Sequence, residues 1–120
     1  MPADNTPPTI AEAVKLTIER LDVYFSVACP ALSSMVYMTK KTWFGHTMKF
    51  HGFYMNGKQK LIKDVVSNIE KETDFTTFDR TAGGSWFHEH ICAHFSPFKQ
   101  SLRIAFRRIE NDIIIITSAY

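Results

Sequence analysis

The chain changes its pattern of apolar residues near residue 73, and this change limits the folds that it can adopt. Before that point, apolar residues recur at three- and four-residue spacing, which is typical of amphipathic helices. After it, apolar and polar residues alternate, which is typical of strands with one buried face. Helices followed by strands predict an α+β fold, in which N-terminal helices pack on a C-terminal antiparallel sheet of about four strands.

Three helices are expected before the change in pattern. Their predicted ranges are 10–24, 40–50 and 58–71. The first begins with a capping box, Thr9 to Glu12, in which a hydroxyl and a carboxylate satisfy free backbone amides. The second is expected to stop at Gly52, a residue that tolerates the left-handed conformation after a helix. Residues 34–39 alternate well enough to form a strand or the entry to the second helix.

Four strands are expected after the change in pattern. Their predicted ranges are 75–80, 86–96, 101–109 and 113–117. A glycine-containing turn at 82–85 separates the first two, and the sequence Glu110-Asn111-Asp112 predicts a hairpin between the last two. The four consecutive isoleucines at 113–116 indicate a strand that is covered on both faces.

The size and composition of the chain fit one domain. With 120 residues, 45% of them hydrophobic, we expect a single core over residues 9–120 behind a disordered tail at 1–8. Cys29 and Cys92 match neither a disulfide framework nor a zinc-finger spacing, which favours free thiols in a reducing compartment. No signal peptide or membrane-spanning apolar run is recognised, so a cytoplasmic location is predicted, reached directly or by delivery into a target cell.

All five histidines fall in two short windows. His46 and His51 lie within residues 42–52, whereas His88, His90 and His94 lie within residues 86–95. Because histidine titrates near neutral pH, it serves as a proton shuttle or as a metal ligand. His46 and His51 are five residues apart, so they are not expected to share one face of an α-helix cleanly. An ordinary half-buried His46 remains an equal alternative.

The second window offers a possible metal site. On a strand, His88, His90, Cys92 and His94 would line one face. Neighbouring side chains on that face lie roughly 6–7 Å apart, close enough to share a metal ion such as zinc. The His-Glu-x-x-His pattern of zinc proteases is absent. The metal site therefore stays an alternative to a polar strand face under a helix, and no cofactor is predicted.

The same residue types suit the cleavage of RNA without a metal. That reaction needs a base for the ribose 2′-OH, an acid for the leaving 5′-oxygen and a cation for the phosphate. We predict that the base and acid come from His46, His51, His88 and His90. Lys49 or Arg103 would stabilise the phosphate, and Tyr120 or Trp86 would stack on a base. Lys58 and Arg80 are further candidates for substrate binding.

The order of these features resembles small toxin nucleases of the RelE, barnase, EndoU and colicin-type group. The segment VYMTKKTWFGHTMKFHG, the lysine-rich helix and the ending IAFRRIENDIIIITSAY carry the resemblance, which spans about residues 34–120. It implies metal-independent RNA cleavage with His46, His51, Thr117 and Tyr120 near the site, and an immunity protein or antitoxin as partner. The chain departs from the pattern at Phe50, because an arginine usually precedes the second histidine. The histidines at 88–94 have no counterpart.

A non-enzymatic binding protein is the second hypothesis, such as an immunity protein, an antitoxin or a subunit of a small assembly. The chain is 13% aromatic and carries a net charge of +2. Both values are ordinary for proteins that bind other proteins. The sequence thus predicts an RNA-cleaving enzyme first, with a protein-binding module and a metal-binding protein as alternatives.

Overall fold

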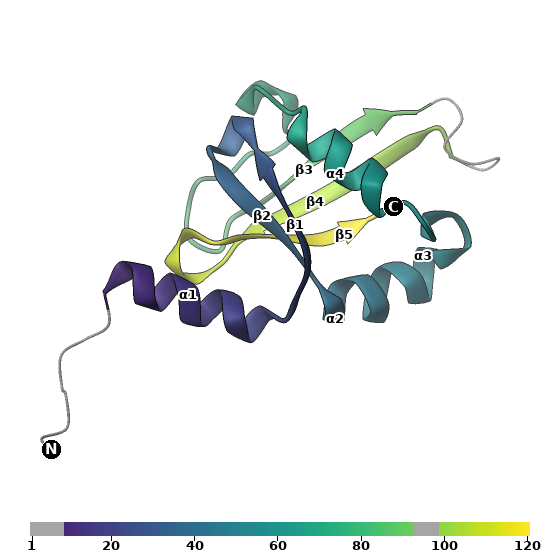
Figure 1. Cartoon of the computed structure of the whole chain (residues 1–120). Coiled ribbons are helices and arrows are strands. Elements are labelled where there is room, and N and C mark those ends of the chain that lie inside the picture. The colour runs from purple at the N-terminus through teal and green to yellow at the C-terminus, as the bar shows by residue number, and fades with distance from the viewer. Residues whose placement is uncertain (1–8, 93–98) are drawn as a thin grey trace, which may run out of the picture.

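The computed structural model describes residues 9–92 and 99–120, so the predicted tail at 1–8 lies outside the described residues. The elements follow one another as α1 (Ile10–Leu21), β1 (Val23–Cys29), β2 (Ser34–Thr39), α2 (Lys40–Thr42), α3 (Met48–Met55), α4 (Gln59–Ser67), β3 (Ser85–Ile91), β4 (Ser101–Arg108) and β5 (Ile114–Ala119) (Figure 1). A π-helical turn, Trp43–Thr47, joins α2 to α3. Residues 40–55 therefore form one continuous helix, which we call the α2–α3 helix.

The strands form one sheet in the order β1-β2-β5-β4-β3. All neighbouring strands are antiparallel except β2 and β5, which run parallel. The predicted α+β fold is confirmed, with helices mostly in the first half of the chain. The sheet, however, has five strands where about four were expected, and it is mixed. The parallel pair is allowed because a long connection with α3, α4, β3 and β4 separates β2 from β5.

Two strands, β1 and β2, come from the first half of the chain. Residues 34–39 form the strand that was one of their two expected alternatives, whereas β1 occupies residues that the helical spacing had partly assigned to the first helix. That helix does not extend to residue 24. It ends at Leu21, since Asp22 adopts the left-handed conformation with φ 53°. The next seven residues alternate between exposed and buried, with Phe25, Val27 and Cys29 facing the core. β-branched and aromatic side chains favour this extended path. The start of the helix matches the prediction, because the Thr9 hydroxyl accepts a hydrogen bond from the Glu12 amide.

The α2–α3 helix continues past Gly52, where its end was predicted, and stops at Met55. Glycine inside a helix costs about 1 kcal/mol relative to alanine. The extra turn offsets this cost by burying Met55, which is fully inaccessible to solvent. The next helix, α4, is shorter than the predicted 58–71. It ends at Ser67, and the Asn68 side-chain amide then donates to the Asp64 carbonyl at 2.6 Å.

The strand predicted at 75–80 is not formed. Only Thr76 pairs with the sheet, through two backbone hydrogen bonds to Phe87. Thr77 then has φ 56°, which breaks an extended path. The rings of Phe75 and Phe78 pack on Trp86 instead, so the segment is a loop whose two aromatic side chains contact the core. Of the predicted strand 86–96, β3 accounts for the part up to residue 91, and residues 93–96 lie outside the described residues.

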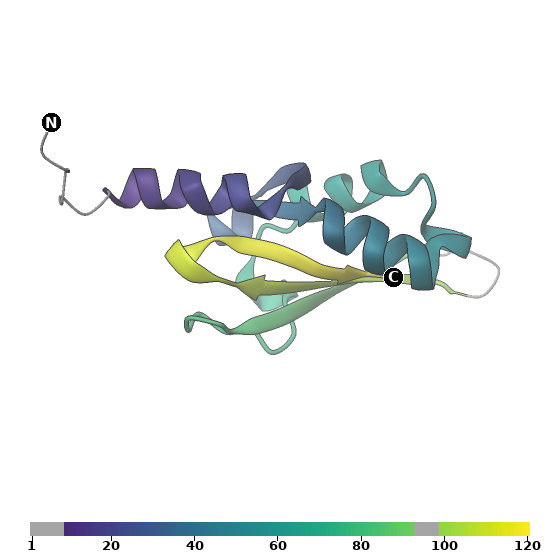
Figure 2. The same ribbon diagram turned by 90° about the horizontal axis from the view of Figure 1, so that it is seen from below.

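The two C-terminal strands agree with their predicted ranges to within two residues, and the hairpin between them is confirmed. Seen edge-on, α1 and α4 lie on one face of β3, β4 and β5 (Figure 2). No α-helix of the described residues lies on the other face. The core between the layers includes fully buried Val36, Ile62, Ile104 and Phe106. Within the described part of the chain, none of the helices is both long and apolar enough to cross a membrane.

Candidate active site

The α2–α3 helix carries the first pair of histidines to the end of β5. Its α2 and π-helical segments pack against β5. In both views α3 lies close to the C-terminal end of that strand (Figures 1 and 2). Trp43, 1% exposed, anchors the helix by packing edge-on against Phe25 at a ring distance of 6.1 Å. The helix is therefore held firmly next to the last residues of the sheet.

The π-helical turn brings His46 and His51 together. The Met48 amide donates to the carbonyl of Trp43, five residues earlier, instead of four. Such a turn holds more residues than an α-helical turn and occurs often at functional sites. The two imidazole rings lie 5.4 Å apart between centroids, at an interplanar angle of 66°. The expectation that five-residue spacing would keep them apart was wrong, because it assumed regular α-helical geometry.

Two tyrosines hold the His51 ring in place. Tyr120 stacks on it with centroids 4.9 Å apart and an interplanar angle of 17°. The hydroxyl of Tyr54, one helical turn further on, lies 3.1 Å from His51 Nδ1. With Nδ1 engaged in this way, the Nε2 atom of His51 is the nitrogen left for chemistry. Sequence reasoning had named Tyr120 but had missed Tyr54.

A lysine completes this group. The Lys99 Nζ atom lies 4.3 Å from the ring centroid of Tyr120 and 5.7 Å from that of Tyr54. Arg103 is adjacent, since its backbone exchanges two hydrogen bonds with Tyr120, of 2.6 and 3.0 Å. We call His46, His51, Tyr54, Lys99 and Tyr120 the His51 site. It combines two imidazoles, a primary amine and two phenols.

Burial and positive charge tune the ionisation of this site. Burial lowers the pKa of His51 below its ordinary value, and the charges of His46 and Lys99 lower it further. The pKa of Lys99 is also lowered, mainly by burial, although Glu89 opposes this effect. Burial raises the pKa of Tyr54. His51 is therefore biased toward the neutral imidazole, the form that accepts a proton.

We predict that Lys99→Met raises the pKa of His51 toward its ordinary value, because it removes a nearby positive charge. The pKa should rise only part of the way, because burial is the larger cause of the lowered pKa and the substitution does not remove it. Titration of the imidazole proton signals by NMR would measure it. Lys49→Met is the matched control: this lysine is exposed and contributes nothing to the lowering, so the pKa of His51 should not move. An unchanged pKa in Lys99→Met would contradict the coupling.

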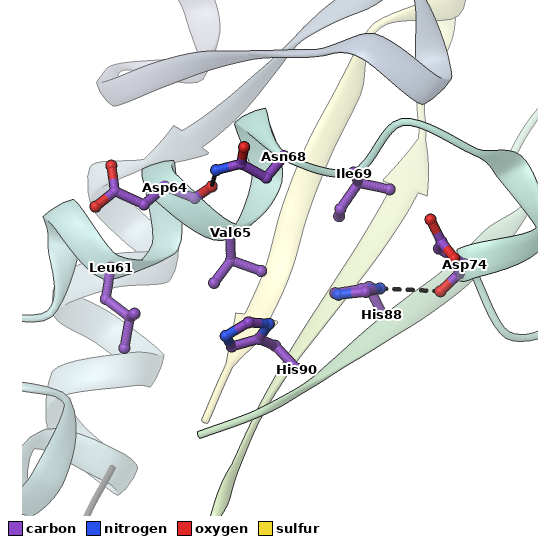
Figure 3. A pocket seen from close by; sticks show the side chains of 8 residues that line it. All are labelled: Leu61, Asp64, Val65, Asn68, Ile69, Asp74, His88 and His90. Carbon is purple, nitrogen blue, oxygen red and sulfur yellow. Dashed lines mark hydrogen bonds between the residues drawn. The ribbon is translucent and has the colours of Figure 1, made fainter. Parts of the chain in front are cut away.

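The second pair of histidines lines a different cavity, which we call the α4–β3 cavity. It has a volume of about 480 Å³ and lies between α4 and β3. His88 and His90 form one side, facing Leu61 and Val65 of α4 (Figure 3). The His88 Nδ1 atom lies 2.9 Å from the Asp74 carbonyl oxygen, which fixes the orientation of that ring. The two ring centroids are 6.4 Å apart.

The two pairs of histidines do not converge among the described residues. His88 and His90 lie on β3 and face α4. Tyr120 of the His51 site follows β5, and its backbone pairs with Arg103 of β4. In the sheet, β4 lies between β3 and β5. Adjacent strands lie about 4.8 Å apart, so the backbones of β3 and β5 are separated by roughly twice that distance. No contact joins the pairs in residues 9–92 and 99–120. A single site built from all four predicted histidines is therefore not formed.

The alternative metal site also rests on this second window. His94 lies outside the described residues. Within those that are described, no three side chains of His, Cys, Asp or Glu are arranged to hold a metal ion. Cys92 is half-buried and packs against the hydrophobic core. His88, His90 and Cys92 thus do not make up a metal site by themselves.

The structure distributes the other predicted residues over several places. Arg103 and Thr117 line a groove of about 290 Å³ next to Tyr120, on the face of the sheet opposite α1 and α4. Trp86 is 2% exposed inside the core, so its predicted stacking on a base is wrong. Arg80 forms an ion pair with Glu72. Lys49 lies over the ring of Phe50, and Lys58 is half-buried at the start of α4.

Two residues of the His51 site were missed in the sequence for different reasons. Tyr54 follows His51 by three positions, a spacing at which helical side chains meet, but the helix had been ended too early at Gly52. Lys99 precedes β4 in a segment without periodic pattern, so no local signal indicated it. Comparison with known proteins adds no relative: no protein-family model, no curated protein and no solved structure matches this chain.

Proposed function

We propose that this protein is a metal-independent endoribonuclease of toxin type, and that the His51 site cleaves the RNA. The observation that carries the proposal is the pair of imidazoles, His46 and His51, with ring centroids 5.4 Å apart beside the amine of Lys99. Two imidazoles at this distance can both reach the oxygens of one phosphodiester. Together with a cation they supply the base, the acid and the charge stabilisation that RNA cleavage needs.

The base in this proposal is His51. Its pKa is lowered, mainly by burial, so its imidazole is neutral near neutral pH. The Nδ1 atom lies 3.1 Å from the hydroxyl of Tyr54. In the tautomer that this proposal requires, Nδ1–H donates to that hydroxyl, which leaves the lone pair of Nε2 for the ribose 2′-OH. Tyr120 keeps the ring in this orientation by stacking on it. A fixed tautomer and a fixed ring are what a general base requires.

The reaction then proceeds in one transesterification step. His51 takes the 2′-OH proton, the 2′-oxygen bonds to phosphorus, and the bond from phosphorus to the 5′-oxygen breaks. His46, as imidazolium, donates its proton to the leaving 5′-oxygen. The products are a 2′,3′-cyclic phosphate and a 5′-OH end. Lys99 stabilises the negative charge that builds on the phosphate oxygens, the role that had been assigned to Lys49 or Arg103.

An inhibitory protein partner, as proposed for a toxin, would find a suitable surface on the same helix. Phe44 is 56% exposed, Phe50 63% and Phe53 83%, and all three lie on the α2–α3 helix. Phe50 also contacts the ring of His46, with centroids 5.3 Å apart. Exposed aromatic side chains favour protein contacts. A partner that bound there would also cover His46.

The direct test is to incubate the purified protein with RNA in excess EDTA and to analyse the ends of the products. We expect cleavage in the presence of EDTA, with 2′,3′-cyclic phosphate and 5′-OH ends. Cleavage that EDTA abolishes would contradict the proposal and would favour a metal site. If no RNA is cleaved, the aromatic surface of the α2–α3 helix would make the protein-binding hypothesis the better account.

A further inference from the structure

A groove lies next to the His51 site, on the face of β3, β4 and β5 opposite α1 and α4. Figure 2 shows these two helices on the other side of the three strands. We call this groove the sheet groove. It has a volume of about 290 Å³, and the lining residues used below are Phe87, Arg103, Thr117, Ser118 and Tyr120. Tyr120 belongs to both places, since it lines the groove and stacks on His51. A ligand bound at His51 could therefore continue directly into the groove.

An irregularity in β5 places two residues with hydroxyl side chains along this groove. Ala105 pairs with Ser118 and Phe106 with Ile116, which leaves Thr117 as an extra residue. A bulge of this kind changes the normal alternation of side chains. Thr117 and Ser118 consequently both line the groove, although they are neighbours in the chain. Adjacent hydroxyls at such a position suit hydrogen bonds to ribose and phosphate oxygens.

The opposite side of the groove presents a flat cation. The guanidinium carbon of Arg103 lies 3.7 Å from the ring centroid of Phe87, which is a close stacking contact. This contact places the guanidinium over the ring of Phe87, and the Arg103 side chain remains partly accessible to solvent. RNA-binding proteins use aromatic rings and arginine planes in this way to stack unpaired bases. Duplex RNA has no free base face to offer, because its bases stack on one another.

The charge around the groove also fits a nucleic acid. Arg103, half-buried, and Arg107, exposed, lie on the same face of β4, and Lys99 lies beside Tyr120. Glu89 of β3 pairs with Arg103 in the strand register and brings a negative charge next to it. Three cations against this carboxylate favour a polyanion, because the RNA backbone carries one charge per nucleotide.

We propose that the sheet groove is a binding subsite for single-stranded RNA, in which an unpaired base next to the cleaved phosphodiester stacks on the guanidinium of Arg103. The inference rests on the proposed function for the identity of the polymer. Arg103 and Phe87 would take the base-stacking role that the sequence had suggested for Trp86, whose ring is buried.

The test measures binding without cleavage. A fluorescent octanucleotide of RNA with 2′-O-methyl groups cannot be cleaved, since it has no free 2′-OH, and fluorescence anisotropy gives its Kd in EDTA. Arg103→Lys keeps the charge but removes the plane, so we expect binding to weaken about tenfold, as for the loss of one base-stacking contact. Phe87→Leu, which removes the ring under the guanidinium, should act in the same direction.

The matched control is Arg20→Ala, which removes an exposed arginine from α1 and should leave the Kd unchanged. Binding of Arg103→Lys and Phe87→Leu within twofold of the original protein would overturn the inference, as would tighter binding of duplex than of single-stranded RNA. This outcome is distinct from failure of the proposed function. Cleavage with no dependence of binding on Arg103 would leave the function standing, whereas Arg103-dependent binding without any cleavage would leave only the subsite standing.

Discussion

His46→Ala and His51→Ala are each expected to slow RNA cleavage in EDTA by at least about a hundredfold, the effect typical of losing an acid or base group. The two residues have different roles but act on the same phosphodiester. Removing either one leaves a proton without a donor or an acceptor, so the double variant should lose little more activity than a single one. Initial rates on a labelled RNA, with far-ultraviolet circular dichroism to confirm folding, would measure this.

His90→Gln decides between the two pairs of histidines. Its ring lines the α4–β3 cavity and makes no contact with the His51 site among the described residues. If cleavage depends on His46 and His51 while His90→Gln cleaves normally, the reaction belongs to the His51 site. Full activity in His46→Ala and His51→Ala, with loss in His90→Gln, would move the reaction to the cavity and refute the assignment.

Phe106→Ala should destabilise the fold more than any surface substitution, by about 3–5 kcal/mol. Phe106 is fully buried in β4. Its ring stacks on Trp86, with centroids 6.0 Å apart, and meets the ring of Phe75 edge-on at 5.5 Å. Alanine would leave a cavity beside these two aromatic rings. The cavity cannot collapse easily, because Trp86 is held in β3 and Phe75 is held next to the bridge between Thr76 and Phe87. Urea denaturation followed by circular dichroism would give the change in the free energy of unfolding.

Phe44→Ala is the control of the same chemical type. Phe44 is 56% exposed and contacts Tyr24 edge-on, with ring centroids 5.0 Å apart. Its loss should reduce the free energy of unfolding by about 1 kcal/mol or less, since such an aromatic pair contributes that amount. Equal effects of the two substitutions would show that Phe106 does not lie in the core as described.

Much of the secondary structure could be predicted because its signals are local. The Thr9 cap, the start of α4 and the hairpin between β4 and β5 each depend on a few neighbouring residues. The errors arise where a local signal is ambiguous or where packing overrides it. Phe25 fits both the helical spacing before it and the strand alternation around it, and only the left-handed Asp22 decides between them. Gly52 would end an isolated helix, but burial of Met55 carries the helix further.

The candidate site could be predicted only in part. His46, His51 and Tyr120 were recognised by residue type, and the structure brings these three together. Their proximity depends on the π-helical turn, which no spacing rule for α-helices anticipates. Trp86 was predicted to stack on a base, which requires an exposed ring. The loop with Phe75 and Phe78 covers it, however, and only the tertiary structure reveals that cover.

The sequence by itself therefore determined the α+β class, most of the helices and strands, and the residue types from which a site could be built. These properties follow from local periodicity, since the spacing of apolar residues records which side of each segment must be buried. Tertiary structure alone decided which histidines meet, that Lys99 and Tyr54 join them, and that α1 and α4 lie on the same face of β3, β4 and β5. Such contacts join segments far apart in the chain, and they depend on strand order and on the path of the α2–α3 helix, neither of which a local pattern encodes.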